Sequence, residues 1–217
     1  MNDLDEAPPK FDAAFQDKLE HLIVWRRDVR RFRTDPVDPE LVHKLLALAD
    51  HAPSVGNSQP WRFVLVENAE KREGVRALFE KANNEALADY EGGKAALYAR
   101  LKLAGLKEAP VHLAVFTDIE TAQGSGLGRR TMPETLDYSA VTAVYTLWLA
   151  ARAWDLGVGW VSIIDPVEVR TLLEVPACWH LVAYLCIGYP QEEHLDPELE
   201  RRGWQARTDF DKRVTIL

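Results

Sequence analysis

The chain has 217 residues, of which 47% are hydrophobic and 28% are charged. This size and balance are typical of one globular domain with a single core, and they exclude disordered, collagen-like and coiled-coil chains. The 26 basic and 34 acidic residues give a net charge of −8, which argues against general nucleic-acid binding, because that requires a basic face.

The first part of the chain carries four regular patterns. Residues 11–25 place apolar side chains at helical spacing, which predicts an amphipathic helix. Asp38 and Pro39 are an N-cap and a first helical position, so a second helix is expected to begin there. Residues 61–67 alternate as a strand does, and residues 70–90 return to helical spacing.

The second part is expected to hold three strands and a long apolar helix. Residues 111–117 are apolar enough for a central strand. The helix predicted over residues 133–155 lacks a broad polar face, so it lies in the core or at a subunit interface. Strands are also predicted at residues 158–164 and 181–188, with a short helix at residues 166–173 between them.

Two segments are less regular. Residues 90–109 contain three glycines, which disfavour a helix, and are expected to form a mobile helical lid. The last 28 residues, from Pro190, have too few apolar side chains for a core of their own and are expected to wrap over a partner subunit. Strands and helices do not alternate strictly, which favours one α+β domain over residues 1–217.

Simple sequence features indicate where the protein is located and whether it binds a metal ion. The acidic N-terminus lacks the apolar core of a secretory signal, and the longest uncharged apolar stretch, residues 138–151, is too short for a bilayer. Cys178 and Cys186 are too few for a disulfide framework. We therefore expect a soluble cytoplasmic protein, and the scattered histidines predict no metal site.

An island of arginine is the most unusual feature of this acidic chain. Guanidinium groups bind phosphate in a bidentate manner, and Arg26 and Arg30 are expected to point the same way on a helical turn. Asp28 inside the island is either an ion-pair partner or a base for a bound ligand. A solvated basic surface is the alternative. The arginines of the island are Arg26, Arg27, Arg30, Arg31 and Arg33.

A second polar group lies in residues 52–63, APSVGNSQPWRF. Its prolines and glycine fix an irregular backbone between a helix and a strand. Ser54, Asn57 and Ser58, with Gln59, offer donors and acceptors that suit a polar heterocycle. An ordinary polar loop is the alternative.

Two glycine-containing stretches are weaker signals. In residues 157–166, GVGWVSIIDP, two glycines would allow a flat ligand to approach the backbone, with Ser162 just beyond. Residues 124–130, GSGLGRR, suggest a dinucleotide loop, but Arg129 occupies the third glycine position. A flexible loop is expected there.

The motifs RRDVRRF, APSVGNSQPWRFV, LKLAGLKEAPVHLAVF, GSGLGRRTMPETL, GVGWVSIIDP and YLCIGYPQEEH follow one another along the chain. In this order they resemble the nitroreductase-like flavoproteins and, within them, the 5,6-dimethylbenzimidazole synthases, over residues 11–204. The resemblance implies an α+β homodimer with a mainly antiparallel sheet flanked by helices. It also implies FMN at two interface sites and a C-terminal tail that extends onto the partner subunit.

The resemblance further implies that reduced FMN is both cofactor and substrate. Dioxygen would convert it to a peroxyflavin, which would be fragmented to 5,6-dimethylbenzimidazole, the lower ligand of cobalamin, and erythrose 4-phosphate. NAD(P)H would serve as an indirect reductant, through a separate flavin reductase.

Residue roles are implied by the same motifs. Asp28 would be the catalytic carboxylate, and Ser162 would assist proton transfer. The turn from Arg26 to Arg30 would hold the ribityl phosphate and the pyrimidine edge of the flavin, while the backbone of Gly159 would contact the ring. The full flavin-binding set is Arg26, Arg27, Asp28, Val29, Arg30, Ser54, Asn57, Ser58, Gly159, Ser162 and Arg207.

Two other functions stay open at this point. One is an NAD(P)H-dependent nitroreductase or flavin reductase of the same fold. The other is a non-catalytic module that binds flavin or phosphate. Nucleic-acid binding through the arginine island is the weakest hypothesis, because the island is small and the rest of the chain is acidic.

Overall fold

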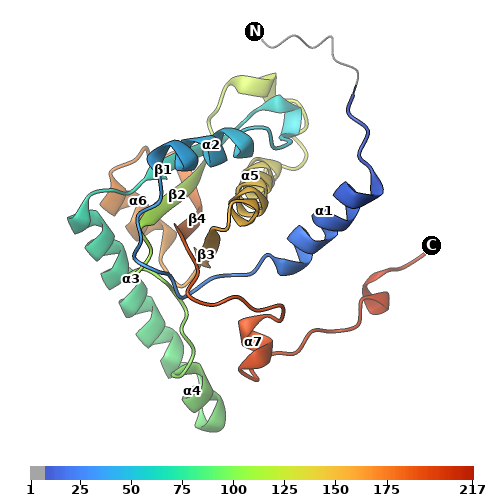
Figure 1. Ribbon diagram of the computed structural model, residues 1–217. Coiled ribbons are helices and arrows are strands. Elements are labelled where there is room, and N and C mark those ends of the chain that lie inside the picture. The colour runs from blue at the N-terminus through green and yellow to red at the C-terminus, as the bar shows by residue number, and fades with distance from the viewer. Residues whose placement is uncertain (1–7) are drawn as a thin grey trace.

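A four-stranded antiparallel sheet forms the centre of the molecule (Figure 1). The computed structural model describes residues 8–217. Both central strands are largely buried, as expected for strands covered on two faces. The α+β class with a mainly antiparallel sheet is thereby confirmed. In the sheet order β1-β2-β4-β3, the strands are Trp61–Leu65 (β1), Val111–Asp118 (β2), Trp179–Gly188 (β4) and Gly157–Val161 (β3).

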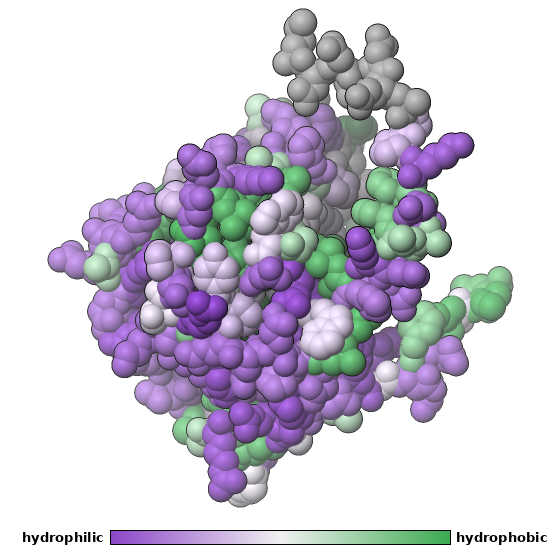
Figure 2. Space-filling model, viewed as in Figure 1, coloured by the Kyte–Doolittle hydropathy of each residue, from purple (hydrophilic) through white to green (hydrophobic). Residues whose placement is uncertain are grey.

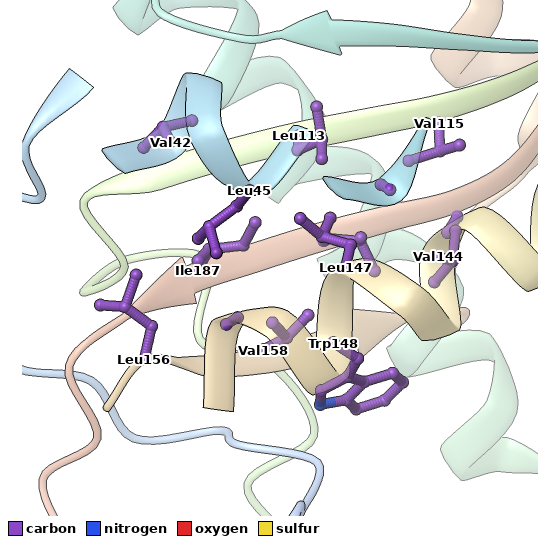
Figure 3. Close-up of a cluster of buried hydrophobic side chains, with 14 of the residues drawn as sticks. Val42, Leu45, Leu113, Val115, Val144, Leu147, Trp148, Leu156, Val158 and Ile187 are labelled. Atoms are coloured by element: carbon purple, nitrogen blue, oxygen red, sulfur yellow. The ribbon is translucent and has the colours of Figure 1, made fainter. Parts of the chain in front are cut away.

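Helices cover both faces of this sheet. α2 (Pro39–Ala49) and α5 (Thr135–Ala153) pack on one face, and α3 (Ala69–Ala88) and α6 (Pro166–Leu173) on the other (Figure 1). Successive strand residues point to opposite faces, so neighbours along β2 and β4 enter different cores. Figure 3 shows the core beneath α2 and α5, which includes Leu45, Leu113, Leu147, Val158 and Ile187.

Most element boundaries follow from local capping. The Asp38 side chain accepts a hydrogen bond from the Glu40 N–H at 2.9 Å, which confirms the predicted start of α2. The strand predicted over residues 158–164 is too long, because β3 ends at Val161. The chain turns there so that Asp165 can cap the first turn of α6.

The long apolar helix is real but shorter than expected. α5 begins at Thr135, two residues after Pro133, and ends at Ala153. Gly157, one residue before the predicted start of the next strand, is the first residue of β3. The helix lies centrally against the sheet and α2, as its apolar surface predicts.

Three helices lie away from this centre (Figure 1). α1 (Ala13–Trp25) has no buried residue, although its apolar side chains lie on one face. α4 (Gly92–Tyr98) is the one helical part of the segment expected to form a lid, and α7 (Glu198–Arg201) lies in the C-terminal tail. No helix within the described part of the chain is long and apolar enough to cross a membrane.

Candidate functional site

The arginine turn, residues 26–33, is an extended segment that runs beside β3. The Val29 N–H donates to the Val158 carbonyl oxygen at 3.0 Å. The prediction that Arg26 and Arg30 share a helical face is therefore wrong: α1 has ended, and the backbone at Arg26 is extended. In an extended chain, alternate side chains share a side, which sets residues 28 and 30 next to each other.

The two glycines of β3 admit this turn. A Cβ on Gly159 would lie 2.1 Å from the Val29 carbonyl oxygen, and a Cβ on Gly157 would lie 2.6 Å from a methyl group of Val29. The sequence interpretation assigned this space to a flat ligand, but the protein's own chain fills it. A backbone contact from Gly159 to a flavin stays a prediction.

Asp28 is held by both of its carboxylate oxygens. Oδ1 accepts a hydrogen bond from the Trp160 N–H at 2.9 Å, and Oδ2 accepts one from Arg30 Nε at 2.7 Å. The Asp28 side chain is nevertheless 33% exposed. Its carboxylate is thus fixed in orientation and still open to a ligand.

Two arginines of the turn form ion pairs within the chain. Arg31 Nη1 lies 2.8 Å from Glu198 Oε1 and 3.1 Å from Glu192 Oε1, so it ties the turn to the C-terminal tail. The Glu198 carboxylate, which accepts this hydrogen bond, raises the pKa of Arg31. Arg33 pairs with Asp35 on the exposed surface.

The guanidinium groups of Arg26, Arg27 and Arg207 have no carboxylate within 4.0 Å among the described residues, although the backbone N–H of Arg207 donates to Glu200 Oε1 at 3.4 Å. Arg26 stacks over the Trp148 ring, with its Cζ atom 4.9 Å from the ring centroid, and Arg27 donates to two backbone carbonyls. The Nε atoms of Arg26 and Arg27 are buried without a hydrogen-bond partner. Burial, then Arg26, then Arg207 lower the pKa of Arg27. Crowded cations without an anion are the arrangement that a phosphate group would stabilise.

A hollow of about 50 Å³ separates the turn from the tail. That space is on the order of one or two water molecules, too little for a flavin ring. Acidic side chains such as Glu192 and Asp196 and basic ones such as Arg27 and Arg30 line it, whereas Arg26 and Arg207 do not. It is a packing seam between the turn and the tail.

The polar loop, residues 52–60, is anchored on α5. The Val55 N–H donates to Ser139 Oγ at 3.0 Å, and Thr142 Oγ1 donates to the Pro53 carbonyl oxygen at 2.8 Å. The hydroxyl groups of Ser139 and Thr142, one helical turn apart on α5, therefore hold residues 53–55 of the polar loop.

The polar groups of this loop differ in how accessible they are. Ser54 Oγ accepts a hydrogen bond from the Gln59 N–H at 3.1 Å, and Asn57 Oδ1 accepts one from Gln59 Nε2 at 2.9 Å. Ser58 is only 3% exposed, and its hydroxyl has no hydrogen-bond partner in the part of the chain that the structure describes. Ser54 and Asn57 are the better placed for a ligand.

The glycine loop, residues 124–130, packs against the polar loop. A Cβ on Gly56 would lie 2.8 Å from the Leu127 carbonyl oxygen, and one on Gly124 would lie 2.6 Å from the Gly56 carbonyl oxygen. A Cβ on Gly128 would meet a side chain of the polar loop at 2.7 Å. The expectation of a flexible loop missed this interlock, although glycine at every second position of GSGLG was a signal for close packing.

The arginine turn and the polar loop do not meet within one chain. The turn contacts α5 where Trp148 Nε1 donates to the Arg27 carbonyl oxygen at 3.1 Å. The polar loop contacts α5 at Ser139, nine residues earlier, or roughly 13 Å along a helix. The predicted residues thus form two groups: Arg26, Arg27, Asp28, Val29, Arg30, Gly159 and Arg207 in one, and Ser54, Asn57 and Ser58 in the other. Ser162 lies just past the end of β3 and is exposed.

Comparison with known proteins gives a consistent picture. The Nitroreductase family model matches residues 23–189. The 5,6-dimethylbenzimidazole synthase of Rhodospirillum rubrum is 59% identical over 199 residues, which cover 92% of this chain and 94% of that protein. The protein of the same name from Rhodobacter capsulatus is 47% identical and covers 94% of this chain and 99% of its own.

A solved structure extends the likeness to the fold. The crystal structure of oxidized iodotyrosine deiodinase bound to FMN and 3-iodo-L-tyrosine has a TM-score of 0.69 and 29% identity. It covers 81% of this chain and 91% of that one. The resemblance drawn from the sequence motifs is confirmed.

Proposed function

The chain belongs to the Nitroreductase family, and from its likeness to two 5,6-dimethylbenzimidazole synthases we propose that it is an enzyme of that kind. Its substrate is reduced FMN, which is fragmented in the presence of dioxygen to the benzimidazole and erythrose 4-phosphate. The observation that carries the proposal is an open carboxylate, Asp28, held next to Arg26 and Arg27, whose guanidinium groups pair with no carboxylate of the described residues.

The residues fit the phosphate end of FMN. Arg26, Arg27 and Arg207 supply positive charge, and the buried Nε atoms of the first two would gain an acceptor. When bound, FMN supplies a redox-active ring that reacts with dioxygen and is itself consumed. The chain's contribution is to hold the phosphate, orient the ring and move protons.

Asp28 is the group that moves protons in this proposal. The Trp160 N–H and Arg30 hold its two oxygens, so little freedom remains to be lost when the flavin binds. Ser162 follows the last residue of β3 and is exposed. We assign it an assisting role in proton transfer.

A second copy of the chain completes the site in this proposal. The polar loop and the arginine turn lie apart on α5, so each flavin would contact the turn of one copy and the loop of the other. Figure 2 shows hydrophobic side chains gathered over α1 and along the C-terminal tail, where a partner would cover them. The exposed ones include Phe15, Leu19, Ile23, Phe210 and Ile216.

The remaining parts of the proposal concern solvent, reductant and location. The segment of residues 90–109 would exclude water from the ring, which suppresses loss of reactive species to solvent. NAD(P)H would act through a separate flavin reductase. A cytoplasmic location is consistent with two free cysteines, Cys178 and Cys186.

Product analysis tests this function. The protein is loaded with FMN without oxygen, reduced with dithionite and then exposed to air, and the products are identified by mass spectrometry. We expect 5,6-dimethylbenzimidazole. Full recovery of FMN would overturn the proposal, and rapid NAD(P)H-driven turnover of a nitroaromatic compound would instead favour a reductase of this fold.

A further inference from the structure

The helix α4 lies at the far end of α3, away from the sheet, and packs against the C-terminal tail (Figure 1). Tyr98 is its one buried side chain, 6% exposed. The Tyr98 ring centroid lies 4.9 Å from that of Tyr90 and 5.9 Å from that of Trp204. Trp204 also meets Tyr90 edge to face at 5.4 Å, and Lys94 Nζ lies 5.1 Å from the Trp204 ring centroid. Trp204 is thus the side chain through which the tail holds α4.

Trp204 is fixed to α7 by a C-terminal helix cap. Gly203, at φ 77°, takes the left-handed backbone that ends a helix, and its N–H donates to the Glu200 carbonyl oxygen at 2.9 Å. The Trp204 N–H donates to the Leu199 carbonyl oxygen at 2.8 Å, which is the second hydrogen bond of this cap. The Arg207 N–H donates to Glu200 Oε1 at 3.4 Å. Trp204 and Arg207 are therefore both tied to α7.

Electrostatic repulsion opposes the docking of the tail at Arg207. This side chain lies close enough to Arg27 to lower the pKa of Arg27, so the two cations repel each other when no anion lies between them. A phosphate group that accepts hydrogen bonds from both replaces this repulsion with attraction. The docked tail, and with it Trp204, is then more stable.

We propose that Trp204 is a positioning residue that links α4 to the phosphate site, so that the phosphate group of FMN stabilises the docked position of α4. Phosphate at Arg207 holds the tail in place, and Trp204 on the same tail packs against Tyr98. Because coupling between two sites is reciprocal, the docked helix in turn strengthens the binding of a flavin that carries phosphate. Riboflavin has the same ring without the phosphate and gains nothing from α4. This role rests on the proposed function, because it takes FMN as the ligand.

Affinities for FMN and riboflavin separate this role from a purely structural one. For Trp204→Leu and for Tyr98→Leu we expect the dissociation constant of FMN, measured by flavin fluorescence, to rise about fivefold or more. The dissociation constant of riboflavin should stay as in the wild type, which also shows that each variant is folded. The double variant should lose no more FMN affinity than either single variant, because both substitutions remove the same contact.

Three control variants define what the contact requires. Tyr98→Phe loses the hydrogen bond to Asn83 but keeps its ring, and Trp204→Phe keeps an aromatic ring against Tyr98. Both should bind FMN nearly as the wild type does. Trp154→Leu removes an exposed ring that contacts Lys44 at the end of α5 and should change neither affinity. A wild type that binds FMN no better than riboflavin would overturn the proposal, as would Leu variants that lose affinity for both flavins equally.

Hydrogen exchange measures the docking of α4 directly. Saturating oxidised FMN should slow amide exchange in residues 92–98 of the wild type more than saturating riboflavin does, and Trp204→Leu should remove this difference. Equal protection by the two flavins in the wild type would show that the ring alone docks α4, and would overturn the proposal. A wild type that shows the difference but makes no 5,6-dimethylbenzimidazole would contradict the proposed function and still support the role of Trp204.

Discussion

The arginine turn and the polar loop are both anchored on α5, yet they are built by opposite means. The turn is paired along β3, and its charged side chains are sorted by their partners. The loop is neutral, and it is shaped by two hydroxyl groups of α5 and by glycines that interlock with the glycine loop. Side-chain charge therefore decides what the turn does, whereas backbone shape decides what the loop does.

The largest effect is expected when the carboxylate of Asp28, the proposed proton-transfer group of the turn, is replaced. Asp28→Asn keeps the size of the side chain and one acceptor oxygen but removes the charge, so flavin binding should persist. The rate of 5,6-dimethylbenzimidazole formation should fall about 10²- to 10⁴-fold, the usual contribution of a positioned general acid or base. Single-turnover product analysis measures this rate.

Asp35→Asn is the matched control for that variant, because Asp35 pairs with Arg33 on the exposed surface. It should keep the wild-type rate. A fully active Asp28→Asn protein would remove Asp28 from the mechanism.

The next largest effect is a loss of stability at low pH, caused by a buried histidine in the central sheet. His112 is 1% exposed and hydrogen-bonds to the Tyr184 hydroxyl at 2.9 Å, and burial lowers its pKa to about 4. The unfolded chain takes up a proton as the pH falls below about 6.5, whereas the folded chain does so only near pH 4. The free energy of unfolding should therefore fall by about 3 kcal/mol between pH 6.5 and pH 4.

Urea unfolding across this pH range measures the effect. His112→Gln should flatten the part of the slope that belongs to this side chain, because glutamine does not titrate. An identical slope in the variant and the wild type would show that other groups cause the acid sensitivity.

A third prediction tests whether Arg207 belongs to the arginines that bind the phosphate. Arg207 lies close enough to Arg27 to lower its pKa, so Arg207→Met should remove one charge-assisted contact to the phosphate. FMN binding should weaken about ten- to hundredfold, which corresponds to roughly 1.5–3 kcal/mol. Arg213→Met, in the same tail and exposed, should bind FMN as the wild type does. Equal affinities in the two variants would exclude Arg207 from the phosphate site.

The smallest expected effect tests the backbone of the loop. Gly56 and Gly92 have nearly the same positive φ, 57° and 56°, but a Cβ on Gly56 meets the Leu127 carbonyl whereas one on Gly92 meets nothing within 4 Å. Both alanine variants bear the cost of the left-handed backbone. The free energy of unfolding of Gly56→Ala should therefore be about 1–3 kcal/mol lower than that of Gly92→Ala, which is the usual cost of overpacking. Equal values would deny the interlock between the two loops.

Much of the fold was predictable because its signals are local. The cap at Asp38 and the apolar runs of β2 and β4 were enough to place those elements. The end of β3 was not, since it depends on the turn toward Asp165.

The site was predictable in composition but not in geometry. Five arginines in eight residues indicated an anion site. The residues that bind individual arginines, and so decide which of them are available to a ligand, lie far along the chain. Lys102 is 72 residues from Arg30, and Glu198 is 167 residues from Arg31. Likewise, no local pattern shows that α5 separates the turn from the polar loop.

Subunit complementation tests most directly the claim that one flavin uses the turn of one chain and the loop of another. Asp28→Asn and Gly56→Ala chains, each first shown to be impaired alone, are mixed, dissociated and reassembled, and 5,6-dimethylbenzimidazole is quantified. A shared site predicts recovery in about a quarter of the wild-type sites, because half of the randomly formed dimers are mixed and each mixed dimer holds one intact site. Product no greater than the sum of the two separate variants would show that both regions act within a single chain, and would contradict the account.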